Sequence, residues 1–159
     1  MLTLCLVALV SAAPPAGKKP PAAPHPSETA KLFFLTGDIA KAQEFALACA
    51  RREPKKCGPL NKWIAEYAFL VRDSDRLTPE QARELLALDL KIAPDKRGKL
   101  TEKVIERYVT VPLERARSRA TGDRKGALSI VEHVLMVDPK NVTALELQKS
   151  LSNEADAGP

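Results

Sequence analysis

Two stretches of the chain decide its fold: GDIAKAQEFALACARREPKK (residues 37–56) and GDRKGALSIVEHVLMVDPKN (residues 122–141). Both begin with Gly-Asp, place an alanine five residues after the glycine, and carry an acid followed by a proline that stands seventeen residues after the glycine. In the first stretch, apolar residues recur at three- and four-residue spacing, which is typical of an amphipathic helix. Gly37 can supply the left-handed residue that ends a preceding helix, and Asp38 can cap the next one. The pattern predicts a helix–turn–helix unit that occurs twice.

A third copy of the pattern appears when the closing prolines are superposed. It is LTPEQARELLALDLKIAPDK (residues 77–96), which begins with Thr78 as N-cap, a proline in the first turn and Gln81 three residues after the threonine. The copies match at fixed distances before their closing prolines, which are Pro54, Pro94 and Pro139. Twelve residues before the proline stand Ala42, Ala82 and Ala127; eight residues before it stand Ala46, Leu86 and Val131; and five residues before it stand Cys49, Asp89 and Val134. Asp89 places an acid where the other copies have Cys or Val, and the sequence does not identify its partner.

Each copy follows another amphipathic stretch: AKLFFLT, LNKWIAEYAFLV or KVIERYVTVPLERARSRAT. The unit is therefore a helical hairpin, and it occurs three times. This arrangement resembles the tetratricopeptide repeat family, whose second helix carries a small, a larger and again a small residue before a closing proline. The resemblance covers residues 27–152 and implies an all-α fold, a short α-solenoid of antiparallel helix pairs. The spacings of 40 and 45 residues between closing prolines, against about 34 in the family, imply insertions between the copies.

Local signals set the expected ends of several helices. Ser27 follows a proline and is expected to cap the first helix, and Asn141 is expected to cap a final helix that covers the last repeat. The longer insertion is expected to extend the first helix of the third hairpin. Pro112 should kink or interrupt that helix, because proline lacks an amide hydrogen and its ring clashes with the preceding turn.

The segment before the repeats has two parts. Residues 1–12 contain an apolar run that is as long as a signal-peptide core and far short of the roughly 20 residues of a membrane-spanning helix. They predict a signal peptide or membrane-directing segment, removed together with Cys5 by cleavage before Ala13. Residues 13–26 form a Pro/Ala-rich linker, and residues 153–159 are predicted to be a disordered tail.

Export would place the protein in the periplasm or elsewhere in a bacterial envelope. Two alternatives stay open. The apolar run is either the end of a longer transmembrane helix, so that the repeats are the outer domain of a larger membrane protein, or a disordered apolar terminus.

Cys49 and Cys57 are the candidate disulfide. They stand eight residues apart across a predicted helix end and the turn that follows it. The hairpin stack would bring the end of one helix beside the start of the next, and an oxidising compartment would then favour the bond. The alternative is a buried thiol at a small-residue position, with Cys57 unrelated to it. Two cysteines without further ligands do not indicate a metal site.

The residues that could support catalysis are few. His25 lies in the linker and His133 on the second helix of the last hairpin, and no Ser/His/Asp or Cys/His constellation can be assembled from the spacing. No glycine-rich phosphate loop occurs. Glu80 and Glu84 lie one turn apart beside arginines, which indicates a solvated helix face. The sequence therefore predicts no enzyme, no cofactor and no metal.

The family resemblance implies a scaffold or adaptor for protein–protein interaction. In this family the first helix of each hairpin lines a concave face, which would receive an extended peptide or a partner helix. Carried over by resemblance, the groove positions are Lys31, Phe34, Asn61 and Arg119. The predicted leader suggests that such an adaptor works in the cell envelope.

The alternative function is a module that binds a polyanion, either nucleic acid or an acidic surface. The net charge is +5, and the stretch ERARSRATGDRK (residues 114–125) is its most basic segment, with Arg115 and Arg119 on one helix face. Surfaces that bind nucleic acid usually add aromatic side chains, and none follows Tyr108 in the chain. The pattern therefore favours a solvated helix face over a polyanion site.

Overall fold

The computed structural model describes residues 24–156 of the 159-residue chain. These residues fold into helices joined by short turns, with no strand among them. The helices are α1 (Pro26–Thr36), α2 (Ile39–Arg52), α3 (Pro54–Arg72), α4 (Pro79–Ile92), α5 (Lys99–Ile105), the π-helical turn η1 (Glu106–Thr110), α6 (Val111–Arg119), α7 (Arg124–Val137) and α8 (Val142–Asp156). The all-α prediction is confirmed.

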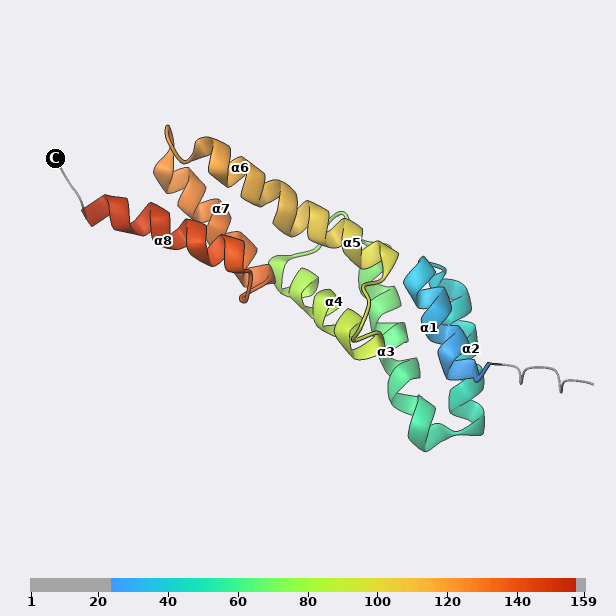
Figure 1. Ribbon diagram of the computed structural model, residues 1–159. Coiled ribbons are helices and arrows are strands. Elements are labelled where there is room, and N and C mark those ends of the chain that lie inside the picture. Colours follow the sequence, from blue (N-terminus) through green and yellow to red (C-terminus); the bar gives the residue numbers. More distant parts are fainter. Residues whose placement is uncertain (1–23, 157–159) are drawn as a thin grey trace, which may run out of the picture.

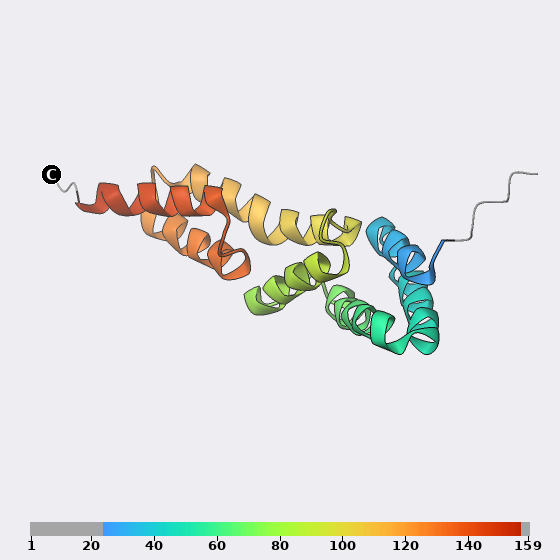
Figure 2. The same cartoon turned by 60° about the horizontal axis from the view of Figure 1, so that its bottom comes forward.

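The helices pack mainly against their neighbours in the chain, as a stack of hairpins requires (Figure 1). α1 packs on α2, α3 on α4, and the continuous helix α5–η1–α6 on α7. α2 against α3 joins the first hairpin to the second, α4 against α7 joins the second to the third, and α8 covers α7. The result is an elongated array with α1 and α2 at one end and α8 at the other, which a second view also shows (Figure 2). The predicted solenoid-like architecture is confirmed, while membership of the tetratricopeptide family stays an interpretation of the sequence.

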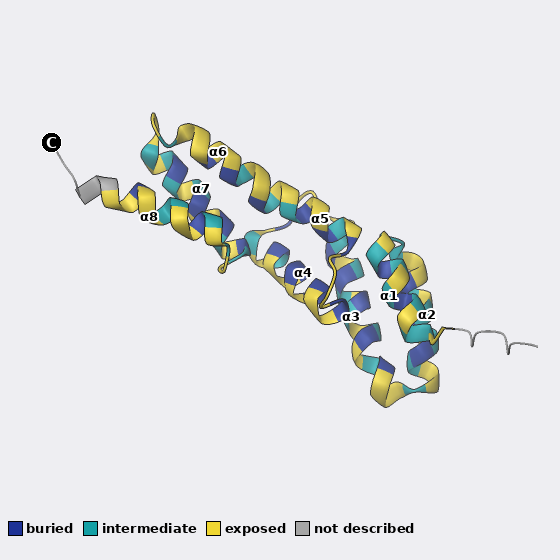
Figure 3. Cartoon of the chain, in the orientation of Figure 1, coloured by how far each residue is buried: buried dark blue, intermediate teal, exposed yellow. Residues whose placement is uncertain are grey.

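The core lies along the seam between the helices, because each helix buries one face and exposes the other (Figure 3). The repeated alanines Ala42, Ala82 and Ala127 are all fully buried, and their small side chains let paired helices approach closely. The large side chains of the core include Phe34 and Tyr67, whose rings meet edge to face with centroids 4.7 Å apart.

Most of the predicted helix ends are confirmed. Gly37 ends α1 with φ 87°, and the Asp38 carboxylate accepts a hydrogen bond from the amide three residues on, at 3.2 Å. Thr78 and Gln81 form the expected reciprocal pair of side-chain-to-backbone bonds, at 3.3 and 2.9 Å. The Asn141 side chain accepts from the amide three residues on, at 3.0 Å. Each cap satisfies backbone donors that the first turn of a helix leaves unpaired.

The N-cap predicted at Ser27 is wrong. α1 begins at Pro26, so the cap is His25, whose Nδ1 accepts from the Ser27 amide at 3.3 Å. Proline at the first helical position has its φ already set for a helix and has no amide to satisfy. This moves the helix start ahead of the serine.

The first helix of the third hairpin is long and interrupted, as Pro112 predicts. In the turn η1 the Val111 amide donates to the Glu106 carbonyl, five residues back instead of four. The buried residues Val104 and Val109 on this helix are likewise five apart, where an α-helix would repeat every three or four. The π-helical turn therefore absorbs one extra residue next to a proline that cannot donate.

Asp89 finds its partners at the joint between the second and third hairpins. Its Oδ1 accepts from the Gly98 amide at 3.0 Å and from the Thr101 hydroxyl at 2.7 Å. Thr101 also lies 2.8 Å from the Tyr67 hydroxyl, so the bonds connect α3, α4 and the start of α5. Asp89 and Thr101 are fully buried. Burial raises the pKa of Asp89, and its hydrogen bonds and the guanidinium of Arg97, 3.7 Å away, oppose this.

The cysteine pair behaves as predicted. The sulfur atoms of Cys49 and Cys57 lie at bonding distance, with Cα atoms 5.6 Å apart, and both side chains are buried. The pair joins the last turn of α2 to the first turns of α3. That the protein works in an oxidising compartment stays a prediction, as does cleavage of the leader.

The predicted leader (residues 1–12) and residues 13–23 of the linker lie outside the described residues. The sequence predicts a disordered tail from residue 153, but α8 continues to residue 156. No glycine or proline within residues 142–156 interrupts this helix. No helix in the described part of the chain is both long and apolar enough to cross a membrane.

Candidate partner-binding surface

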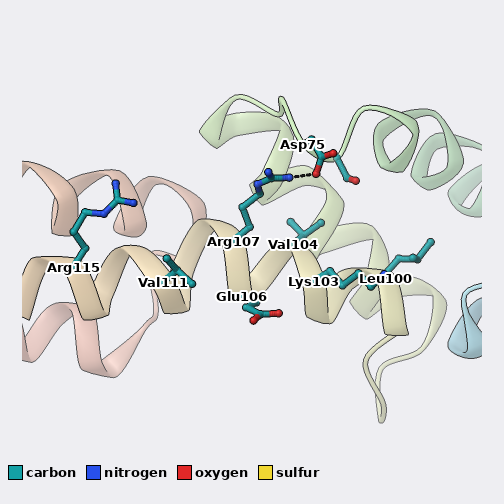
Figure 4. A pocket seen from close by; sticks show the side chains of 9 residues that line it. Asp75, Leu100, Lys103, Val104, Glu106, Arg107, Val111 and Arg115 are labelled. Carbon is teal, nitrogen blue, oxygen red and sulfur yellow. Dashed lines mark ion pairs between the residues drawn. The ribbon is translucent and has the colours of Figure 1, made fainter.

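A large cavity lies along the helix α5–η1–α6, where it faces the loop that joins α3 to α4 (Figure 4). It has a volume of about 760 Å³ and is open to solvent. We refer to it as the π-turn cavity. It is lined by Ser74, Asp75, Leu100, Lys103, Val104, Glu106, Arg107, Val111 and Arg115.

The π-turn cavity combines apolar side chains with cations. Leu100, Val104 and Val111 supply the apolar part, and Val111 is 42% exposed although it is a large aliphatic residue. Lys103, Arg107 and Arg115 supply the positive charge.

The sequence places these three cations and Val111 on one line along the helix. Residues 103, 107, 111 and 115 are four apart, so successive side chains lie about one helical turn from each other. Figure 4 shows Arg107 and Arg115 extending to the same side of the helix, with Glu106 on the opposite side.

One of the three cations is already paired. Arg107 forms an ion pair with Asp75 of the α3–α4 loop, drawn as a dashed line in Figure 4. The Asp75 side chain is 80% exposed, and exposed pairs of this kind contribute only about 0–1 kcal/mol. Lys103 and Arg115 have no ion pair within the described part of the chain. Several carboxylates of an incoming partner could therefore pair with these three cations at little cost.

A smaller, more apolar cavity of about 350 Å³ lies on the other side of the π-helical turn, between α6, α7 and the start of α4. Arg107 lines both cavities, and Tyr108, Pro112 and Ile130 supply the apolar wall of the smaller one. His133 also lines it, with Nδ1 2.8 Å from the Ser129 carbonyl oxygen, to which Nδ1 can donate.

Tyr108 fixes the loop above the π-helical turn. Its hydroxyl accepts from the Leu77 amide at 2.8 Å and donates to the Ser74 carbonyl at 3.2 Å. π-Helical turns are rare and frequently occur at functional sites. The turn η1 thus stands between two cavities and holds the loop that lines one of them.

The four groove residues expected from the family resemblance are not brought together. Lys31 is half-buried on α1 and lies 3.4 Å from Glu28, while Arg119 is exposed and is the last residue of α6. Asn61 is half-buried on α3 and lines none of the cavities described above. Phe34 is only 1% exposed and belongs to the core, because its ring fills the space beside Tyr67. Phe34 is therefore not a groove residue.

The basic stretch at residues 114–125 is divided among different surroundings. Arg115 lines the π-turn cavity, and Arg117 is exposed outside it. Arg119 lies 3.9 Å from Asp123, and Arg124 donates to the Leu151 carbonyl of α8. These arginines do not form one continuous basic surface.

Sequence reasoning missed Lys103, Arg107 and Val111. Two signals could have found them. The buried residues of this helix change from three- and four-residue spacing to five-residue spacing before Pro112, and the cations of the same segment stand at positions 103, 107 and 115, which are separated by four and eight residues.

Comparison of the chain with family models, curated proteins and solved structures gives no match. Within the described residues, no group of three or more His, Cys, Asp or Glu side chains is placed to hold a metal ion.

Proposed function

We propose that this chain is a binding module that docks an acidic segment of a partner protein in the π-turn cavity. The single observation that carries the proposal is the cavity itself, in which the exposed Val111 and the partly exposed Leu100 share one continuous helix with three cations. Exposed apolar surface next to charge is typical of surfaces that bind other proteins. The module would act as an adaptor, without catalysis and without a cofactor.

The shape and charge of the cavity define the partner segment. An aliphatic or aromatic side chain would cover the exposed Val111, and carboxylates on either side of it would reach Lys103 and Arg115. A further carboxylate would replace Asp75 on Arg107, a site that suits bidentate binding. An open cavity along a helix suits an extended peptide or a second helix better than a small molecule.

The sequence supports the same class of function. The resemblance to the tetratricopeptide repeats implies a scaffold for protein interaction, although the site proposed here lies on the third hairpin and not at the family's groove positions. The predicted leader and linker support a place in the cell envelope, where the linker would hold the domain away from a membrane surface.

Affinity capture with matched variants tests the proposal. The wild-type protein and the variants Val111→Asp, Arg115→Glu and Arg117→Glu would be used as baits, followed by mass spectrometry. We expect a protein that the wild type and Arg117→Glu retain and that the other two variants lose, because Arg117 lies on the same helix outside the cavity. Melting temperatures would check that all four proteins fold.

The same experiment separates the polyanion alternative. Binding to a polyanion weakens steeply as salt rises, because counterions compete, whereas binding with apolar anchors weakens little. If Arg117→Glu weakens capture as much as Arg115→Glu does, and salt abolishes both, the protein is a polyanion binder and the proposal is wrong.

A further inference from the structure

A separate cavity opens at the other end of the molecule, where α1, α3 and the last turn of α4 meet. It has a volume of about 360 Å³, within the range of small-molecule sites. The residues that matter for its chemistry are His25, Lys31, Lys56, Leu60, Trp63 and Lys91. We refer to it as the lysine cavity. Of the groove positions that the family resemblance implies, only Lys31 lines it, and it shares no lining residue with the π-turn cavity.

Four of the residues lining the lysine cavity are basic, and none is Asp or Glu. The three lysines come from three different helices, so the fold and not a run of sequence brings them together. Lys31 and Lys56 each have one acidic neighbour just outside the lining. Lys91 has no ion pair within the described residues. Three ammonium groups therefore face two carboxylates, and the cavity is positive.

Glu53 holds two of these basic groups in place. One carboxylate oxygen lies 2.9 Å from His25 Nε2 and the other 2.8 Å from Lys56 Nζ. The bond from Lys56, and then the bond from His25, lower the pKa of Glu53 to about 2. The Cys49–Cys57 pair holds the same turn from the inside. The Lys56 side chain is 80% exposed, and an exposed pair of this kind contributes little to stability, so a ligand can take the place of Glu53 on Lys56 at little cost.

Apart from Ser27, the remaining wall of the lysine cavity is apolar. Trp63 is partly buried against the core, and Leu60 is 6% exposed. An indole presents a flat apolar face on which a ring or a short aliphatic chain can pack. The lysine cavity therefore offers a positive side and an apolar side to one small ligand.

We propose that the lysine cavity binds a small organic phosphate, with the phosphate near Lys31, Lys56 and Lys91 and the organic part against Trp63. A phosphate monoester carries about −1.5 to −2 charges at pH 7, so it gains more from several ammonium groups than a single carboxylate would. Lysine is a common phosphate ligand that acts as a point charge. The inference does not depend on the function proposed for the π-turn cavity.

Trp63 is the only tryptophan of the chain, so its fluorescence reports on this cavity directly. The full-length protein would be titrated with phenyl phosphate, inorganic phosphate, benzoate and benzyl alcohol. We expect a saturable change with phenyl phosphate. Inorganic phosphate, benzoate and benzyl alcohol, which each lack part of the charge or the ring, should bind at least about tenfold more weakly, equal to 1.4 kcal/mol.

Matched lysine variants complete the test. Lys31→Ala and Lys91→Ala should each weaken binding of phenyl phosphate several-fold. Lys62→Ala should not, because Lys62 is the exposed neighbour of Trp63 in sequence and does not line the cavity. The absence of a saturable change, equal binding of benzyl alcohol or benzoate, or an equal loss in Lys62→Ala would overturn the inference. Melting curves would show whether the variants fold.

Discussion

Asp89 offers the sharpest test of how the hairpins are joined. In the variant Asp89→Ala, the Gly98 amide and the Thr101 hydroxyl lose their acceptor in a region without solvent. A buried donor left without an acceptor costs about 1–3 kcal/mol, so two of them should lower the free energy of unfolding by about 2–6 kcal/mol. The Tyr67 hydroxyl can still bond to Thr101, which keeps the loss toward the lower end.

The isosteric variant Asp89→Asn separates the hydrogen bonds from the charge. Its side-chain oxygen can take the place of Oδ1 and keep both bonds, so it should be clearly more stable than Asp89→Ala. Its amide nitrogen would take the place of Oδ2, which is buried without a hydrogen bond and lies near Arg97. Because this nitrogen is itself a donor, it would find no acceptor there, and the variant should gain little stability from the loss of the charge.

The pH dependence of the two proteins should differ in a defined direction. The folded-state pKa of Asp89 is raised, so the folded state favours the protonated carboxyl. The contribution of the Asp89 carboxyl to stability is therefore fully present below its unfolded-state pKa, near 3.8. This contribution is lost as the pH rises through the raised pKa of the folded state. Relative to Asp89→Asn, the wild type should therefore become more stable on acidification toward pH 4.

Urea denaturation of both variants and the wild type at several pH values would measure these differences. Subtracting Asp89→Asn from the wild type removes the contribution of carboxyls such as Glu53, whose lowered pKa acts in the opposite direction. Equal stability of wild type and Asp89→Ala, or a difference from Asp89→Asn that does not change between pH 7 and pH 4, would refute the reasoning.

Three further predictions concern the stack itself. Reduction of the Cys49–Cys57 pair should cost about 2–3 kcal/mol without loss of helicity; two thiols titrated in oxidised protein would contradict the bond. Ala127→Leu should cost about 1–3 kcal/mol by overpacking a fully buried position, whereas the partly exposed Ala120→Leu should cost much less; equal small effects on melting temperature would speak against the hairpin alignment. Arg124→Ala should cost about 1–3 kcal/mol by removing the donor to an α8 carbonyl; unchanged hydrogen exchange in α8 would show that this bond does not hold the helix.

The fold could be predicted well where the signal is local. Gly37 needs a left-handed conformation, and the Thr78–Gln81 pair satisfies donors within one turn, so neighbouring residues decide both helix ends. His25 was missed because Pro26 set the helix start ahead of the better capping residue, Ser27. Such competition between two local preferences is not visible from either one alone.

The candidate site could be predicted less well because it depends on contacts between distant segments. Asp89 and Thr101 meet only after the second hairpin packs on the third, and the Asp75–Arg107 pair needs the same packing. Phe34 occupies a position that the family resemblance assigns to a groove, but Tyr67 packs over it in this chain.

The central claim is that the π-turn cavity is the surface that meets a partner protein. A photoreactive benzophenone amino acid placed at Val111, which is 42% exposed, would test it in cells that make the protein. The account predicts a crosslink to a discrete partner protein at this position and none from the same group at Arg117. It also predicts that the crosslink disappears when Arg115→Glu is added. No crosslink at Val111, or equal crosslinking at the two positions, would contradict the claim.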